Sequence, residues 1–94
     1  MTTTTDFLTE NQDKLEAFTK AITIAHGKNH PEVFDVRDAY VALTQNAASN
    51  ANLDADFAKL RAITSDYAIP GDVCPTFEAT YHMLEEADQL NAAK

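Results

Sequence analysis

Apolar residues recur along this chain at intervals of three and four, which is the spacing of one face of an α-helix. Turn-forming residues divide the pattern into four segments. Two glycines and three prolines are few for a β-rich chain, which needs turn residues at short intervals. The apolar positions are Leu8, Leu15, Phe18, Ile22 and Ala25; Val33, Val36, Tyr40, Leu43 and Ala47; Leu53, Phe57, Leu60, Ile63 and Tyr67; and Phe77, Tyr81, Leu84, Ala87 and Leu90. The pattern predicts an all-α protein.

The first helix is expected to follow a threonine-rich start. Residues 1–5 contain little apolar surface, so we expect about 1–5 to be disordered. Asp6 or Thr5 is a suitable cap for the helix, and Gly27 is expected to end it in the left-handed conformation.

The second helix is expected to begin at Pro31, because proline suits the first turn of a helix. Asn29 and Glu32 lie three residues apart and resemble a capping box. The apolar pattern fades over residues 46–52, where small and polar residues predict a turn.

The third segment is expected to end at residues 68–73, since Pro70 restricts its predecessor and Gly71 permits a turn. Pro75 then opens the fourth helix. Short turns place successive amphipathic helices side by side in opposite directions. We therefore expect one domain, residues 1–94, folded as an antiparallel up-down-up-down four-helix bundle.

The net charge of the chain excludes some classes of binding partner. Fifteen acidic and seven basic residues give a net charge of −8, and no lysine or arginine cluster offsets it. Such a surface repels phosphate groups, so we expect no nucleic acid partner and no anionic membrane partner. The single Cys74 and the lack of a secretion signal or long apolar run predict a cytoplasmic protein.

His26 and His30 lie four residues apart in the turn between the first two helices. Two imidazoles at this spacing share a metal ion such as iron or zinc when both lie on one continuous helix. Gly27 and Pro31 interrupt the helix here. The alternative, which the pattern favours, is a polar turn with His26 at a helix C-terminus and His30 in the next cap.

His82 and Glu86 form a second pair four residues apart, with Glu78 one turn earlier and Glu85 adjacent. This face could bind a divalent ion loosely, but it lies beside the apolar stripe and therefore favours a solvated surface. A helical di-iron site typically uses two Glu-x-x-His pairs, and the sequence contains none.

Cys74 precedes Pro75 near a helix N-terminus, where the dipole and free N–H groups lower a thiol pKa. A reactive thiol is one interpretation. A buried small apolar side chain is the favoured one, because no histidine or lysine lies close in sequence. The chain has no Ser/His/Asp triad motif and no nucleotide fingerprint. These features do not establish an enzyme, and they favour a non-catalytic role.

Two stretches resemble a known family. Residues 60–77 are similar to a Leu-Arg-x-Leu-Thr…Pro-x-x-Ala-Cys-x-Thr-aromatic segment, and residues 25–33 are similar to Val-His-Gly-x-x-His-Pro-Glu-Leu. Both segments are typical of the RIC family, the iron–sulfur cluster repair di-iron proteins YtfE and ScdA. The resemblance covers about two-thirds of the chain in two blocks and implies a hemerythrin-like four-helix domain.

The resemblance implies that family members hold a non-haem di-iron centre and help to restore damaged iron–sulfur clusters. Carried over by position, only His26 falls on a ligand of that centre, whereas other ligand positions fall near Thr5 and Asn50. It therefore implies a truncated relative without the di-iron centre. We expect no cofactor, or iron if the family's site survives in part.

The combined expectation is a non-catalytic accessory or interaction protein related to cluster repair, with a protein partner or a homodimer. The alternative is an iron- or zinc-binding protein that uses His26 and His30 in cluster repair or in a nitrosative stress response. Glu32 or His82 would then assist them.

Overall fold

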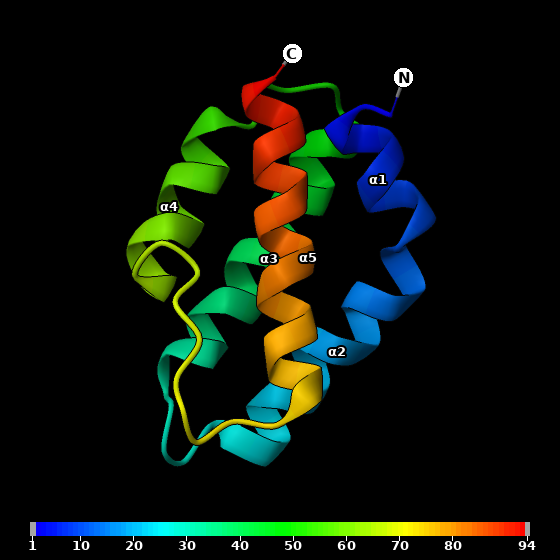
Figure 1. Ribbon diagram of the computed structural model, residues 1–94. Helices are drawn as coiled ribbons and strands as arrows, with labels where there is room; N and C mark the ends of the chain where they lie inside the picture. Colours follow the sequence, from blue (N-terminus) through cyan, green and yellow to red (C-terminus); the bar gives the residue numbers. More distant parts are fainter. Residues whose placement is uncertain (1, 94) are drawn as a thin grey trace.

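The computed structural model describes residues 2–93, which contain five helices and no strand. Successive arms of the chain run in opposite directions, and both described ends of the chain lie at the same end of the molecule (Figure 1). The predicted all-α class is confirmed, while the finer expectation of a hemerythrin-like four-helix bundle stays a prediction. The helices are α1 (Thr4–Glu10), α2 (Gln12–His26), α3 (Glu32–Ala48), α4 (Asp54–Thr64) and α5 (Pro75–Ala92).

The first arm is two helices rather than the single one expected. Asn11 interrupts it with φ −106° and ψ 13°, and its side-chain amide donates to the carbonyl of Phe7 at 2.9 Å. The cap of α1 is Thr3, which forms a capping box with Asp6. The expected disorder over residues 1–5 therefore differs from the structure, in which the helix begins at Thr4. Met1 lies outside the described residues.

The buried face of α2 differs in part from the expected stripe. Leu15, Thr19 and Ile22 are fully buried, whereas Phe18 is only partly buried and Ala25 is exposed. The stripe therefore continues through His26, one turn after Ile22. Because His26 lies on the same helix face as these buried residues, its side chain points toward the start of α5 rather than into solvent.

The turn after α2 does not use a left-handed glycine. Gly27 has φ −58° and ψ −30°, so the expected left-handed stop is wrong. The glycine is needed for space instead, since a Cβ there would lie 2.6 Å from the Phe34 ring. The expected Asn29–Glu32 capping box is also absent from the described residues, because Pro31 occupies the N-cap and makes no side-chain bond.

The third segment ends earlier than expected. Helix α4 stops at Thr64, and Ser65, Asp66 and Tyr67 follow with φ of 54°, 61° and 63°. Left-handed backbone is costly for residues with a Cβ. The turn is held because the Thr64 hydroxyl accepts from the Tyr67 N–H at 2.8 Å. Tyr67 is therefore buried from a turn rather than from a helix.

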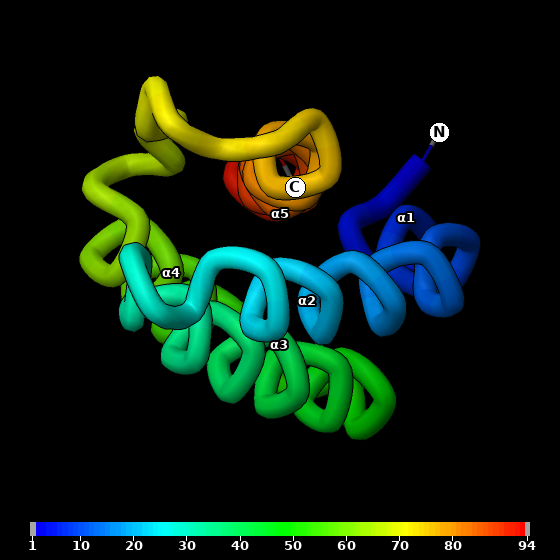
Figure 2. The backbone as a smooth tube through the Cα atoms, turned by 90° about the horizontal axis from the view of Figure 1, so that it is seen from below, coloured from blue at the N-terminus to red at the C-terminus, as the bar shows by residue number. Residues whose placement is uncertain are grey.

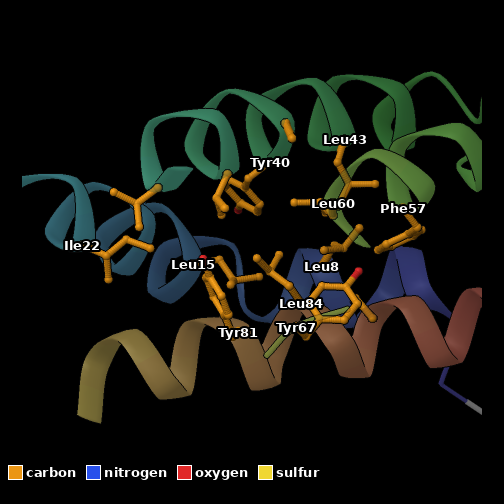
Figure 3. Packing of buried hydrophobic residues seen from close by; sticks show 14 of the residues in the cluster. Leu8, Leu15, Ile22, Tyr40, Leu43, Phe57, Leu60, Tyr67, Tyr81 and Leu84 are labelled. Carbon is orange, nitrogen blue, oxygen red and sulfur yellow. The ribbon is translucent and has the colours of Figure 1, made fainter. Parts of the chain in front are cut away.

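The core lies between α5 and the other helices. Helix α3 packs against α2 and α4, while α5 packs against α2 and α1 (Figure 2). In Figure 3, Tyr81 and Leu84 point from α5 into the layer below α3. The expected stripes of α3 and most of α5 are confirmed as core. The buried apolar residues are Leu8, Leu15, Ile22, Val33, Val36, Ala39, Tyr40, Leu43, Ala47, Leu53, Phe57, Leu60, Tyr67, Phe77, Tyr81, Leu84 and Ala87.

Candidate functional site

The candidate site forms where two connecting segments meet, at the end of the molecule away from the described termini (Figures 1 and 2). One segment is the turn between α2 and α3, which carries both clustered histidines. The other is residues 65–74, which leads from α4 to the start of α5. Two side-chain contacts cross between these segments, one from each histidine.

His26 contacts the only cysteine of the chain. Its Nε2 lies 3.1 Å from Sγ of Cys74, although the two residues are 48 positions apart in sequence. Cys74 is the N-cap of the 18-residue helix α5, and its side chain is partly buried. The helix phase of α2 and the proline start of α5 together bring an imidazole and a thiol into contact.

This contact changes the acidity of the thiol. The pKa of Cys74 is lowered to about 7, chiefly by the hydrogen bond from His26. The backbone N–H groups of Phe77 and Thr76 at the start of α5 lower the pKa further, against a smaller effect of burial. A substantial fraction of Cys74 is therefore thiolate at neutral pH, which is the nucleophilic form. The sequence-based preference for a buried small apolar side chain is met in part, since Cys74 packs partly buried against the core. The neighbouring histidine was missed because it is distant in sequence.

His30 binds carboxylates instead. Its Nε2 lies 2.9 Å and 3.1 Å from the two carboxylate oxygens of Asp72, and its Nδ1 lies 3.2 Å from Oε2 of Glu32. The Asp72 hydrogen bond is the largest cause of a raised pKa at His30, and the same bond lowers the pKa of Asp72. The pair therefore favours imidazolium and carboxylate.

An aromatic side chain forms the floor beneath both histidines. The Phe77 ring meets the rings of His26 and His30 nearly edge-on, with centroids 5.3 Å and 5.7 Å away. The Phe77 ring also packs on the Tyr81 ring, and their centroids are 4.5 Å apart. Phe77 and Tyr81 are almost wholly buried, so the site rests directly on the core.

The predicted metal pair of His26 and His30 stays a prediction. The structure brings the two rings close, with centroids 6.4 Å apart. Both nitrogens of His30 face carboxylate oxygens, however, so a metal would have to displace two partners. Within residues 2–93, no three or more His, Cys, Asp or Glu side chains are arranged to hold a metal ion. We do not assign these histidines as metal ligands.

The second candidate face lies apart from this site. His82 and Glu86 are both exposed on α5, as the solvated interpretation expects. Glu78, at the start of the same helix, is also exposed. The contact between this face and the site is the backbone hydrogen bond from the Glu78 N–H to the Cys74 carbonyl at 3.2 Å, within the first turn of α5.

Sequence reasoning found His26, His30 and Cys74 but missed Asp72 and Phe77 as parts of one site. One signal in the sequence could have placed His26 on the face of α2 that packs against α5. If Thr19 is counted as the buried position instead of Phe18, then Leu15, Thr19 and Ile22 share a helix face with His26. The partnership with Cys74 has no local sequence signal.

Comparison with protein-family models, with curated proteins and with solved structures finds no match to this chain. Within residues 2–93, no helix is long and apolar enough to cross a membrane.

Proposed function

We propose that this protein is a hemerythrin-like accessory protein of the cluster-repair type that does not itself catalyse cluster repair, and that its functional group is a reactive thiol. The observation that carries the proposal is the 3.1 Å contact between His26 Nε2 and Cys74 Sγ at the start of α5. A nucleophile beside a basic imidazole and free backbone N–H groups is the arrangement that activates cysteines. Partial exposure gives small reagents access to the sulfur.

The chemistry that suits this pair is reversible oxidation by a hydroperoxide. The Cys74 thiolate attacks the terminal peroxide oxygen, the O–O bond breaks, and sulfur loses two electrons to become a sulfenic acid. The proton that leaves the Cys74 thiol passes by way of the His26 imidazole to the leaving alkoxide or hydroxide. The products are Cys74–SOH and an alcohol or water.

The sulfenic acid requires a second thiol from outside the chain, because the sequence contains one cysteine. That thiol forms a mixed disulfide with Cys74 and releases water. The proposal therefore includes a thiol-bearing partner, either another protein, a second copy or a small thiol. A further thiol then restores Cys74 by disulfide exchange.

The resemblance to the cluster-repair proteins supports a role under oxidative or nitrosative stress, the conditions that damage iron–sulfur clusters. His26 lies in one of the two similar blocks and Cys74 in the other, and these blocks are the two that meet at the site. Oxidants and nitric oxide, which damage iron–sulfur clusters, also modify thiolates. We therefore propose that the protein responds to the conditions under which such repair is needed.

The metal alternative is less well supported. Iron or zinc at His26 and His30 would require His30 to leave Asp72 and Glu32. Elemental content of the purified protein, measured after ferrous or zinc loading and desalting, tests this alternative. Stoichiometric metal lost in His30→Gln but kept in His82→Gln would favour it over the thiol proposal.

Alkylation of Cys74 by iodoacetamide across a pH series tests the thiol proposal. The wild-type rate should rise with a midpoint at about 7, following the thiol pKa. In His26→Gln the midpoint should move toward the ordinary cysteine value of roughly 8.5. The exposed His82 provides a matched control, so His82→Gln should keep the wild-type profile.

The second arm is direct oxidation. One equivalent of hydrogen peroxide followed by glutathione should add one glutathione to the wild-type mass and none to Cys74→Ser. The proposal is contradicted if wild type and His26→Gln share one alkylation midpoint, or if peroxide leaves the wild-type mass unchanged.

A further inference from the structure

A second contact crosses between the same two segments that bring His26 and Cys74 together. Asp72, two residues before Cys74, binds His30, which lies four residues after His26. The two contacts therefore run side by side between the α2–α3 turn and the start of α5. Phe77 lies beneath both histidine rings.

The His30 contact is the more tightly specified of the two. Both oxygens of Asp72 face Nε2, and Glu32 of α3 faces Nδ1, so the imidazole is oriented from both sides. Only 15% of the His30 side chain is exposed, whereas Asp72 is 64% exposed at the surface of the loop. The loop is therefore attached to a histidine that is fixed by its own turn.

The Cys74 contact has less support of its own. Apart from His26, the groups that act on the sulfur are backbone N–H groups at the start of α5, and they belong to the same helix as Cys74. Just before it, residues 68–73 form no helix or strand. Val73 and Cys74 pack, partly buried, against the core. Asp72 is the side chain of this segment that bonds across to the α2–α3 turn, through His30.

We propose that Asp72 is a positioning residue, which holds the segment before α5 through His30 so that the Cys74 sulfur stays against His26. This inference rests on the proposed function. Asp72 itself does not contact the sulfur or the incoming oxidant. Its role is to keep the thiol and the imidazole within hydrogen-bonding distance.

Electrostatics alone predicts the opposite sign, which makes the proposal testable. A carboxylate near a thiol disfavours the thiolate, so removing it should lower the thiol pKa. If Asp72 positions the thiol, removing it should raise that pKa, because the bond from His26 is the main cause of the low value. The other charged groups facing His30 and Cys74 are Glu32 on α3 and His26 on α2.

The experiment compares alkylation profiles in a double-mutant cycle of Asp72→Ala and His26→Gln. In Asp72→Ala the midpoint should rise by about 0.5 on the pH scale, a third of the change expected for His26→Gln. In the His26→Gln background, Asp72→Ala should cause no further rise, since the contact it protects is already gone. Asp72→Asn, which keeps an acceptor for His30, should fall between wild type and Asp72→Ala.

Glu78→Ala is the matched charge control, because Glu78 is an exposed carboxylate on the first turn of α5. The alkylation midpoint of Glu78→Ala should equal that of wild type or lie slightly below it. Circular dichroism of every variant confirms that the helices are intact.

The outcomes separate the two proposals. A midpoint that falls in Asp72→Ala, or a rise of equal size in the His26→Gln background, overturns the positioning role and leaves the thiol function standing. A His26→Gln profile identical to wild type overturns the thiol function, and the positioning role falls with it.

Discussion

Two sets of side chains join distant segments of this molecule, and they differ in what they can do. At the histidine turn, the His26–Cys74 contact joins α2 to α5. Across the middle, Asp88 of α5 accepts from Arg61 of α4 at 2.6 Å and from the Tyr67 hydroxyl at 2.8 Å. Both sets fix the same helix against other parts of the chain.

The difference lies in protonation and exposure. Asp88 is 10% exposed at its side chain, and Arg61 keeps its charge at all ordinary pH values. Burial and the Asp88 bond raise the pKa of Tyr67. Arg61 and Tyr67 therefore each keep one protonation state near neutral pH, whereas Cys74 with its pKa of about 7 does not. We therefore expect reactivity at the His26–Cys74 contact, and only a contribution to stability from the contacts of Asp88.

The largest expected effect on stability is at the histidine turn. Gly27→Ala should lower the free energy of unfolding by about 1–3 kcal/mol, because the added Cβ overpacks the site. It would lie 2.4 Å from the Thr23 carbonyl oxygen and 2.6 Å from the Phe34 ring. Chemical denaturation measures the loss.

Gly71→Ala is the control for that substitution. Gly71 has open space where a Cβ would be placed, and its φ is not positive. Its free energy of unfolding should stay equal or rise slightly. Equal losses at both glycines would show that close packing does not define the histidine turn.

Tyr67→Phe should have the next largest effect. It removes the hydrogen bond to Asp88 and should lower the free energy of unfolding by about 1–2 kcal/mol. The Cys74 alkylation profile should not move, because Arg61 still pairs with Asp88 and the site lies at the other end of α5. A shifted profile would mean that the two sets of contacts are coupled.

Tyr81→Phe should have a smaller effect in the opposite direction. The Tyr81 hydroxyl is buried and has no hydrogen-bond partner among the described residues. Removing an unpaired buried donor should raise the free energy of unfolding by about 1 kcal/mol. A loss of stability in denaturant unfolding would instead indicate a bound water or another unseen partner at this hydroxyl.

The smallest effect is the pH dependence of the His30–Asp72 pair. The pKa of His30 is raised above 6.5, so its stabilisation is complete below that value and is lost as pH rises through the folded pKa. The pKa of Asp72 is lowered below 3.8, so its stabilisation is lost as pH falls below that value. The contribution of this pair to the melting temperature should therefore be largest between these limits.

The comparison variant is His30→Gln. As pH rises above 6.5, the melting temperature of His30→Gln should fall less than that of wild type. Identical pH profiles for the two proteins would show that the pair contributes nothing measurable to stability, as is common for exposed ion pairs.

The sequence predicted the core better than the site, and the reason is the range of the interactions. The stripe of Val33, Val36, Tyr40, Leu43 and Ala47 could be read because residues three and four apart share a helix face. Phe77, Tyr81, Leu84 and Ala87 followed the same rule. The proline at the start of α5 was likewise a local signal.

Features set by longer-range or irregular backbone were missed. The buried face of α2 passes through Thr19 rather than Phe18 and leads to the partly buried His26 rather than the exposed Ala25. The left-handed turn at Ser65–Tyr67 shortened α4 without a glycine to indicate it. The pairing of His26 with Cys74 joins residues 48 positions apart, so no local pattern in the sequence could predict it.

The central claim is that His26 lowers the pKa of Cys74, and titration of the thiolate absorbance in the ultraviolet tests it most directly. The wild-type protein should titrate with a midpoint at about 7, and Cys74→Ser should show no such transition. His26→Gln should titrate at a higher pH, closer to the ordinary cysteine value of roughly 8.5, while the N–H groups at the start of α5 still lower its pKa. A wild-type midpoint at that ordinary value would contradict the account.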